Sequence, residues 1–600
     1  MRYEADPAPA PRPVRRLAVF SVAVLAVIAP LALLAGCAGA DSEPTAPESR
    51  FPAGWRYDGA GDPVAADHGM VVSTDPLASD IGIEILEAGG NAADAAVAVA
   101  FALAVVNPEA GNIGGDGFLV VRMATGEAVA LDFRCRAPLA AHRDMYLDAE
   151  GNVTEDVLVG HRSVATPGTV AGMGQLHARF GRLPWAALLA PAIALADGFE
   201  VHQRFLNPYG ERLIGMLRRF PASAAQFLPA DGQPSALGEV FRQPELAETL
   251  RRIAAEGADE FYRGKTADLI VAEMERGGGL VTHEDLASYT APWRDPIVFS
   301  YRGHTVISMP PTSSGGVTLA QIANILSRHD LGALGFGSPE TLHIQVEAWR
   351  RAYADRNHRV ADPEFFDVPV ALLTSMDYAD QRAATISPEA ATPSSEVGPA
   401  EWPPAESEDT THYSIVDAEG NAVSVTTTVN SFFGSKVTVA GAGFLLNNDM
   451  DDLAAKPGTP NQFGLVQGEN NAIAPGKRML SSMSPSSALD PDGELFMVTG
   501  TPGGATIITS VFQTLSNVVD HGMGVVAAVE APRIHHQHLP DQIFHEPGGL
   551  APETVAALEA LGHTVVEAGR LQADIQMILV EDGKLTSWSD PRRGGAARGY

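Results

Sequence analysis

One segment divides this chain of 600 residues into two parts. Residues 387–409 are dense in Pro, Ser, Ala and Glu and show no apolar period, which predicts an exposed linker. Directly after it, residues 412–416 and 422–429 are typical of two strands joined by a turn at 417–421. The chain must therefore form a fold in which a linker runs straight into the head of a strand.

Thr410 stands at this junction. A cut between Asp409 and Thr410 would leave Thr410 with both a hydroxyl and a free α-amine. The hydroxyl is a nucleophile and the amine is a base beside it, which is the pair that a threonine hydrolase uses. A threonine that begins a strand is ordinary by itself, so this hypothesis depends on the residues around it.

Length and charge limit the classes of protein that remain. The chain is too long for one simple domain, and its 45% apolar and 19% charged residues are typical of globular proteins. A net charge of −32, without a long Lys/Arg cluster, argues against a nucleic-acid partner.

The first residues are typical of an export signal. Arg12, Arg15 and Arg16 precede an apolar run over 17–35, which ends in Leu-Ala-Gly-Cys at Cys37. This pattern predicts a lipoprotein signal peptide over residues 1–36 and a lipid on Cys37. We expect an exported protein, periplasmic or at the cell surface, that meets the membrane only through this lipid. The alternative is a plain transmembrane anchor.

Only one other cysteine exists, Cys135, so a lipidated Cys37 leaves no intrachain disulfide. No histidine close in sequence would activate Cys135 as a catalytic thiol. After Cys37, residues 37–67 are rich in Pro, Gly and acidic residues and predict a tether. We expect the folded parts at residues 68–409 and 410–600.

Periodicity predicts the larger elements. Helices are expected at residues 78–88, 91–104 and 342–354, and the stretch 172–276 is mostly helical in pattern. Residues 118–122 and 129–133 predict two further strands.

Several blocks, taken in chain order, carry a resemblance. The sequence resembles γ-glutamyltransferases, also called γ-glutamyltranspeptidases, over roughly residues 68–600. The blocks that match are 87–96, 310–316, 347–348, 353–356, 410–414, 420–423, 428–430, 446–452, 480–485, 500–504 and 589–597. No single block would suffice, but their combination is specific.

The resemblance implies an α/β fold, the four-layer αββα sandwich of N-terminal-nucleophile hydrolases. It implies an inactive precursor in which Thr410 attacks the carbonyl of Asp409, leaving a large chain and a small catalytic chain intertwined as a heterodimer. The substrates implied are glutathione and other γ-glutamyl donors, with amino acids or peptides as acceptors. No cofactor and no metal are implied.

The same resemblance assigns residues to the groups of a γ-glutamyl donor. The α-carboxylate would be received by Arg134, Ser481 and Ser482, and the α-ammonium by Asn430, Asp449 and Asp452. Backbone N–H groups of Gly503 and Gly504 would stabilise the oxyanion. Thr428 would orient the Thr410 hydroxyl, and Phe463 belongs to a block similar to an active-site lid.

Four positions depart from the family's pattern. Cys135 replaces a glutamate that would support Arg134, which leaves the affinity for the donor open. Asp449 replaces a longer Gln or Glu, Asp116 replaces a glycine, and Phe463 replaces a tyrosine.

Other interpretations are weaker. The His-His-Gln-His run at 535–538 lacks spaced partners for a metal, and the acids at 449–452 have no spacing for calcium or a glycosidase pair. The glycines at 111–117 match no nucleotide fingerprint. Two functional alternatives stay open: a sister acylase that cuts glutaryl-cephalosporins or poly-γ-glutamate, and a non-catalytic lipoprotein that binds γ-glutamyl compounds.

Overall fold

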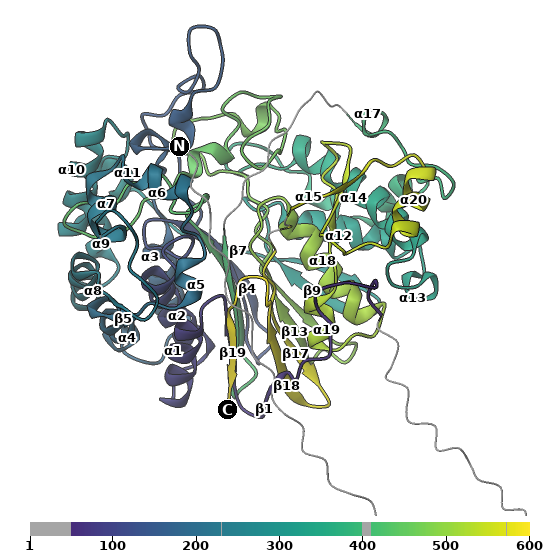
Figure 1. Cartoon of the computed structure of the whole chain (residues 1–600), viewed down its shortest axis with the longest axis horizontal. Helices are drawn as coiled ribbons and strands as arrows, with labels where there is room; N and C mark the ends of the chain where they lie inside the picture. The colour runs from purple at the N-terminus through teal and green to yellow at the C-terminus, as the bar shows by residue number, and fades with distance from the viewer. Residues whose placement is uncertain (1–49, 230, 399–409, 570, 572) are drawn as a thin grey trace, which may run out of the picture. The chain divides into compact units, whose positions relative to one another are not determined.

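Two seven-stranded sheets stand side by side at the centre of the molecule (Figure 1). The computed structural model describes residues 50–600 except 230, 399–409, 570 and 572, so Cys37 and Asp409 lie outside it. The first sheet has the order β19 (Ala596–Gly599), β2 (Met70–Ser73), β10 (Thr411–Val416), β11 (Ala422–Thr428), β3 (Asp116–Arg122), β4 (Ala128–Asp132) and β7 (Trp293–Arg294). The second has the order β1 (Val64–Ala66), β18 (Lys584–Ser589), β17 (Gln576–Glu581), β13 (Leu495–Thr499), β12 (Ser486–Leu489), β9 (His304–Ser308) and β8 (Ile297–Tyr301).

The strands predicted after the linker form the central hairpin of the first sheet. β10 and β11 pair antiparallel, with Thr411 opposite Thr427, and β2 and β3 flank them. The turn between them is closed by Asp417, whose Oδ1 accepts hydrogen bonds from the backbone N–H of Glu419 and Asn421 at 3.0 Å. The strand that follows Thr410 is therefore buried between two neighbours rather than placed at an edge.

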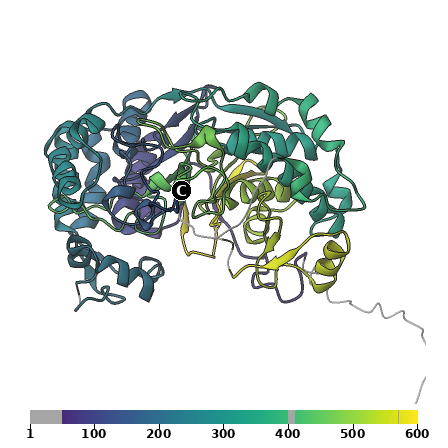
Figure 2. The same cartoon turned by 90° about the horizontal axis from the view of Figure 1, so that it is seen from above.

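Helices cover the outer face of each sheet (Figures 1 and 2). The first sheet is covered by α1 (Pro76–Glu87), α2 (Ala92–Val106), α3 (Thr169–Phe180), α4 (Trp185–Asp197), α5 (Gln203–Leu206), α6 (Glu211–Leu217), α7 (Pro221–Phe227), α8 (Pro244–Glu256), α9 (Asp259–Arg263), α10 (Lys265–Gly277) and α11 (His283–Ala287). The second is covered by α12 (Gly315–Leu326), α13 (Leu331–Leu334), α14 (Pro339–Arg359), α15 (Val370–Leu373), α16 (Met376–Ala383), α17 (Ser394–Val397), α18 (Thr506–Val519), α19 (Val525–Glu530) and α20 (Pro552–Ala560). The expected αββα sandwich is confirmed.

Shorter elements complete the described chain. They are β5 (Phe199–Glu200) with β6 (Val240–Phe241), the small sheet of β14 (Ile534–His535), β15 (Ile543–His545) and β16 (Val565–Glu567), and the 3-10 turns η1 (Glu155–Val157), η2 (His161–Ser163), η3 (Asp449–Asp452) and η4 (Glu469–Asn471). No helix among the described residues is long and apolar enough to cross a membrane.

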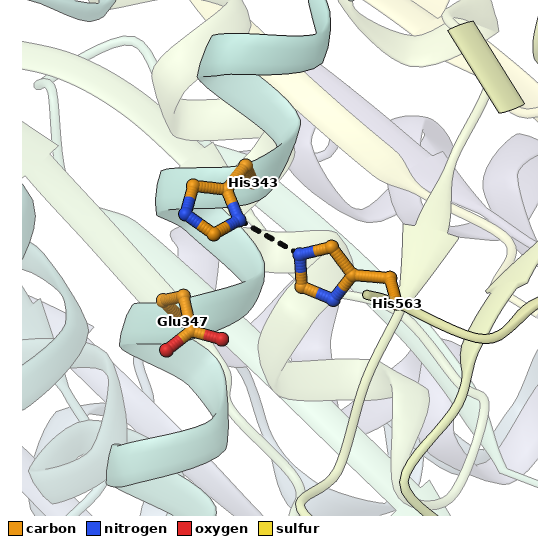
Figure 3. Close-up of side chains that lie close together, drawn as sticks. All are labelled: His343, Glu347 and His563. Carbon is orange, nitrogen blue, oxygen red and sulfur yellow. Dashed lines mark hydrogen bonds between the residues drawn. The ribbon is translucent and has the colours of Figure 1, made fainter. Parts of the chain in front are cut away.

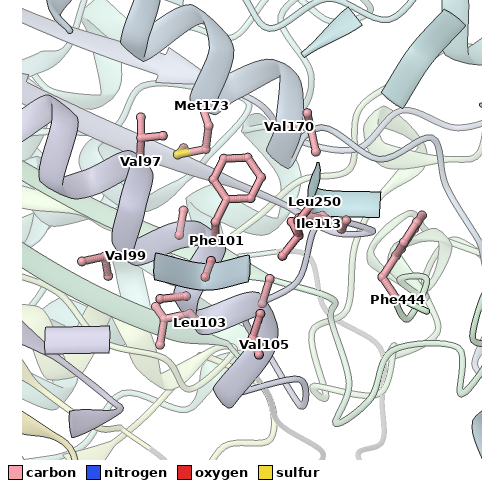
Figure 4. Packing of buried hydrophobic residues seen from close by; sticks show 14 of the residues in the cluster. Val97, Val99, Phe101, Leu103, Val105, Ile113, Val170, Met173, Leu250 and Phe444 are labelled. Carbon is pink, nitrogen blue, oxygen red and sulfur yellow. The ribbon is translucent and has the colours of Figure 1, made fainter. Parts of the chain in front are cut away.

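Helix α2 is the centre of the core behind the first sheet (Figure 4). All of its residues are buried, because its Ala- and Val-rich sequence presents apolar side chains on every face. Asn91 begins the helix with a capping box, in which Asn91 and Asp94 exchange hydrogen bonds at 3.0 and 3.1 Å. Phe101 packs edge-to-face on Trp185 at 5.6 Å between ring centroids. This helix fixes the back of the sheet that carries Thr410.

The structure corrects the expected tether at its C-terminal end. Residues 50–66 pack onto the folded part: Phe51 and Trp55 are buried, and β1 pairs with β18 through Val64 opposite Ser587. The Pro- and Gly-rich composition was misleading, because a few apolar residues in this segment find apolar surface and a free strand edge.

The first part of the predicted linker, residues 387–398, packs onto the folded part. In the described part, residues 387–398, the backbone of Ala391 donates to Leu561 O at 2.7 Å and Ser394 is buried. Ser394 Oγ accepts a hydrogen bond from Arg350 at 2.8 Å, and its N–H donates to Asp541 at 2.7 Å. Side chains far away in sequence hold this segment, which a local pattern does not reveal.

Candidate active site

Thr410 lies at the head of β10, inside the molecule. It is only 5% exposed, and its carbonyl oxygen accepts a hydrogen bond from Arg593 at 3.4 Å. Because Thr411 pairs with Thr427, the next position in the register places Thr410 beside Thr428 at the end of β11. The strand pairing therefore brings the two hydroxyl residues together, as expected.

A narrow pocket opens at this end of the hairpin. Its lining includes most of the residues that the sequence predicted for the site: Arg134, Thr410, Thr428, Asn430, Asp452, Phe463, Ser481, Ser482 and Gly504. Its free volume is about 20 Å³, roughly the space of one water molecule. Gly503 directly precedes Gly504, and Asp449 lies behind the lining against Arg134. The site is thus assembled from both halves of the chain.

Local backbone conformation orients Asn430 at the end of β11. Asn430 has a left-handed conformation with φ of 75°, in which its N–H donates to Thr428 Oγ1 at 2.8 Å. Its side-chain nitrogen donates to Asn448 O at 2.9 Å. Asn is among the few residues that adopt this conformation readily, and it turns the chain away from β11 towards the pocket.

Arg134 is surrounded by three carboxylates. Its Nη1 contacts both oxygens of Asp116 at 2.8 and 2.9 Å and Oδ1 of Asp449 at 2.8 Å, and its Nη2 contacts Asp452. Nε donates to the carbonyl of Met479 at 3.3 Å. The guanidinium is fully buried, so these contacts are desolvated and charge-assisted.

Asp116 supports Arg134 in place of the glutamate that position 135 lacks. Phe118 pairs with Asp132 across β3 and β4, which places Asp116 in register with Arg134 on the same face. Asp116 also accepts a hydrogen bond from the N–H of Cys135 at 2.7 Å. A carboxylate from the neighbouring strand therefore supports the arginine that a glutamate at position 135 would have supported.

Burial controls the acid–base behaviour of the aspartates. Burial, opposed by the Arg134 charge, raises the pKa of Asp452 to about 6, and burial together with Asp452 raises the pKa of Asp451 to about 8. Burial and the neighbouring Asp116 raise the pKa of Asp449 well above its usual range. Asp452 is thus the acid in η3 whose charge is available at neutral pH, and it lines the pocket.

Gly503 and Gly504 lie just before α18, on the wall next to Thr410. Both have positive φ, 132° and 52°, so their backbone conformation favours glycine. Among the described residues, no acceptor takes a hydrogen bond from either N–H group. A side chain at Gly504 would also meet the Phe463 ring at 2.6 Å. Two backbone donors thus remain available on this wall.

Phe463 contributes to the lining of the pocket. The loop that carries it is fastened to the acidic turn η3, because Asn461 donates to Asp452 at 3.2 Å and the N–H of Gln462 donates to Asp451 at 3.2 Å. Gln537 donates to the Phe463 carbonyl at 3.3 Å. The predicted lid residue therefore lies over the pocket, with a phenyl ring and no hydroxyl.

Two groups of potential metal ligands occur among the described residues. In one of them, His343 and Glu347 project from α14 towards His563, and His343 Nδ1 and His563 Nε2 are joined by a hydrogen bond of 2.8 Å (Figure 3). The Glu347 carboxylate already pairs with Arg350 and Arg351 at 3.1 and 2.7 Å. Two guanidinium groups repel a further cation, so this cluster is better explained as a hydrogen-bonded network.

The other group is Asp116, Cys135 and Asp449, where Arg134 already supplies the positive charge. The histidine run expected not to bind metal has separate partners: His535 contacts Thr509, His536 contacts Asp541, and His538 contacts Ser394 O. Their ring nitrogens do not converge on one point.

Comparison with known proteins identifies the family. The family model described as gamma-glutamyltranspeptidase matches residues 78–600. The chain belongs to the γ-glutamyltranspeptidase family. It is 46% identical to the glutathione hydrolase proenzyme of Escherichia coli K12, a match that covers 88% of this chain and 91% of that protein.

Acylases are also among the relatives of this γ-glutamyltranspeptidase family member. The Acylase ACY 1 proenzyme of Pseudomonas sp. SE83 is 41% identical over 87% of this chain and 92% of that protein. The crystal structure of cephalosporin acylase from Bacillus halodurans superposes with a TM-score of 0.78 at 29% identity, covering 92% of this chain and 99% of that one. The fold is therefore that of N-terminal-nucleophile hydrolases, as the resemblance implied.

Two residues of the pocket region were missed by sequence reasoning. Arg356 lines the pocket and Asp116 holds Arg134, yet no role was predicted for either residue. Asp116 could have been found, because it departs from the family at a position that pairs across β3 and β4 with Arg134. Arg356 belongs to a matching block, but nothing local in the sequence shows that α14 points it at Ser482.

Proposed function

We propose that this chain is a glutathione hydrolase and γ-glutamyltransferase, made as a precursor that cuts itself between Asp409 and Thr410. The identity to glutathione hydrolase proenzymes over most of the chain supports this function. The cut would yield a large subunit and a small subunit of residues 410–600, which remain interleaved because β10 and β11 pair with β2 and β3.

One observation carries the proposal: a nucleophile and groups that complement an amino acid meet in one pocket. A γ-glutamyl donor has an α-ammonium and an α-carboxylate at one end and the reactive γ-carbonyl at the other. Asp452 and Asn430 offer oxygen acceptors for the ammonium, while Ser481 and Ser482 offer hydroxyls beside Arg134 for the carboxylate. Asp449 would act indirectly in this proposal, by holding Arg134.

Processing would use the same hydroxyl as catalysis. Thr410 Oγ attacks the carbonyl carbon of Asp409, the C–N bond breaks, and the freed nitrogen takes a proton to become the α-amine. Water then hydrolyses the resulting ester, which leaves a carboxylate on Asp409 and restores the Thr410 hydroxyl. The hydrogen bond from Arg593 to the Thr410 carbonyl would help to hold this peptide in place.

In the mature enzyme, the α-amine of Thr410 takes the proton of its own hydroxyl while Oγ attacks the γ-carbonyl. The N–H groups of Gly503 and Gly504 would stabilise the oxyanion, and Thr428 would keep the hydroxyl oriented. The amine returns the proton to the departing nitrogen, which leaves a γ-glutamyl ester. Water releases glutamate from this ester, whereas an amino acid or peptide acceptor forms a new γ-glutamyl amide.

The two alternatives have less support. A glutaryl group has no ammonium, so it would gain nothing from the acceptor oxygens of Asp452 and Asn430 that line this wall. A purely binding role would need neither Thr410 at the head of β10 nor the free N–H donors of Gly503 and Gly504.

The test compares γ-glutamyl-p-nitroanilide with glutaryl-p-nitroanilide, which lacks the amine. Wild type should prefer the γ-glutamyl donor. Asp452→Asn should lower kcat/KM for that donor about 30- to 1000-fold, since about 2–4 kcal/mol of charge-assisted binding is lost, and should affect the glutaryl donor much less. Preference of wild type for the glutaryl donor, or equal losses on both donors, would favour the acylase alternative. Subunit stoichiometry is measured first, so that only processed enzyme is compared.

We also propose that the protein is exported and held at a membrane by a lipid on Cys37. The supporting observation is the sequence alone: a basic start, an apolar run and Leu-Ala-Gly-Cys ending at Cys37.

A further inference from the structure

Arg356 is a buried cation that faces the pocket without a carboxylate partner. It lies near the C-terminal end of α14, is 1% exposed, and belongs to the pocket lining. Its three nitrogens donate to neutral oxygens: Nε to Ser314 Oγ at 2.9 Å, Nη1 to Asn357 Oδ1 at 2.9 Å and Nη2 to Ser482 Oγ at 3.0 Å. No described carboxylate lies within 4.0 Å of this guanidinium.

The other arginines of the same helix are neutralised. Arg350 and Arg351 share Glu347, and Arg359 lies 3.6 Å from Asp355. A buried charge without a counter-ion is costly, because water no longer solvates it. Arg356 is thus a buried positive charge that no described carboxylate contacts, although the charge of Asp452 acts on it from a greater distance.

Arg134, the other cation of the pocket, is surrounded by carboxylates. Asp116, Asp449 and Asp452 all contact it, and Met479 O takes its Nε proton. A guanidinium has five N–H donors, so one donor at most stays free for a ligand. The positive potential at the serine wall of the pocket must therefore come in large part from Arg356.

The two serines connect Arg356 to a ligand. Ser482 Oγ accepts from Arg356, and Ser481 Oγ accepts from the N–H of Met483 at 3.1 Å. Neither hydroxyl proton goes to an acceptor among the described residues, so both can be donated to a carboxylate. Arg356 also has one unused N–H on each of Nη1 and Nη2.

We propose that Arg356 is a specificity-determining residue that, with Ser481 and Ser482, holds the α-carboxylate of the donor. This inference rests on the proposed function and adds a second guanidinium to the donor site. Arg134 would still reach the carboxylate through its one remaining N–H, while its other donors hold Asp116, Asp449 and Asp452 together. A role in fold alone would require the hydrogen bonds of Arg356 but not its charge.

The test uses two donors that differ only in the carboxylate, γ-glutamyl-p-nitroanilide and 4-aminobutanoyl-p-nitroanilide. Arg356→Gln keeps hydrogen-bonding capacity but removes the charge, and should lower the ratio of the two kcat/KM values at least about tenfold. Arg356→Lys keeps the charge and should retain more of the ratio. Arg351→Gln, the same change at a buried arginine of the same helix outside the pocket, should leave the ratio unchanged.

Inhibition constants of L-glutamate and 4-aminobutanoate give the same comparison without turnover. Equal loss for both ligands in Arg356→Gln, or an unchanged ratio, would overturn the inference and leave Arg356 a structural residue. Such a result would leave the proposed function unaffected. That function is tested separately, by the preference of wild type for γ-glutamyl over glutaryl donors.

Discussion

The pKa of the Asp452 carboxyl group is set by two opposing effects, burial, which raises it, and the charge of Arg134, which lowers it. The carboxylate contacts Arg134 and Asn461 and lines the pocket, and burial raises its pKa to about 6. It can attract an ammonium group only while it is ionised. Since the pKa is raised, the ionised form is present above about pH 6 and is lost as the pH falls through that value.

This balance predicts a pH profile. The α-amine of Thr410, with an ordinary pKa of about 8, must be free to act as base, which gives kcat/KM a slope of one in log units below that pH. With a γ-glutamyl donor, protonation of Asp452 should steepen the slope to two below about pH 6. Asp452→Asn should keep a slope of one, as should wild type with a glutaryl donor. An unchanged profile in Asp452→Asn would contradict the role of this carboxylate.

At this scale, motif blocks predicted which side chains would meet, but not all of their partners. Thr410, Asp452 and Ser482 do lie in one pocket. Asp116 and Arg356 were missed as partners, because their contacts depend on strand register and on the direction of a helix. Neither property can be predicted from the few residues that surround Asp116 or Arg356 in the sequence.

The lid loop is the element that decides access to the pocket. The free space of about 20 Å³ is smaller than a γ-glutamyl group, so we expect the loop that carries Phe463 to move when a donor binds. Hydrogen bonds hold residues 461–463 of this loop to Asp451, Asp452, Gln537 and Ser431, whose Oγ donates to Gln462 Oε1 at 2.6 Å.

We expect Phe463→Ala to raise KM for a γ-glutamyl donor about tenfold, because the ring excludes water and contributes apolar contact. Phe463→Tyr should stay within about threefold of wild type, since the ring is kept. Steady-state kinetics with Phe365→Ala, an exposed phenylalanine outside the pocket, provides the control. If Phe463→Ala binds the donor as well as wild type does, the loop is no lid.

Helices and strands themselves were largely predictable. The apolar pattern placed α1, α2 and α14 within a few residues of their observed ends, and β10 and β11 likewise. The predictions for residues 50–66 and 387–398 were wrong, because Pro- and Ser-rich composition describes local preference and says nothing of distant partners such as Ser587 and Asp541.

The whole molecule is held together by pairing between parts far apart in sequence. β10 and β11 lie between β2 and β3, and β19 joins the other side of β2. The resemblance predicted two stacked sheets covered by helices, but nothing in the sequence analysis predicted the order of the strands within each sheet. A chain cut before Thr410 would therefore stay assembled without a disulfide, as neither Cys37 nor Cys135 has a second thiol within the small part.

The proposed membrane attachment through Cys37 concerns the full chain. We expect wild type to sediment with membranes and to be released by detergent, whereas Cys37→Ser should appear in the soluble fraction with unchanged specific activity. Acyl mass on Cys37 in the large subunit checks the chemistry directly. A soluble wild type whose first residue is not Cys37 would refute the anchor.

The central claim is that Thr410 becomes the N-terminal nucleophile. Intact mass combined with N-terminal sequencing of purified wild type and Thr410→Ala tests it most directly. Wild type should give two chains, the smaller beginning at Thr410 and ending at Tyr600, and Thr410→Ala should give one uncut and inactive chain. An active single chain in wild type, a small subunit that begins elsewhere, or normal subunits from Thr410→Ala would contradict the account.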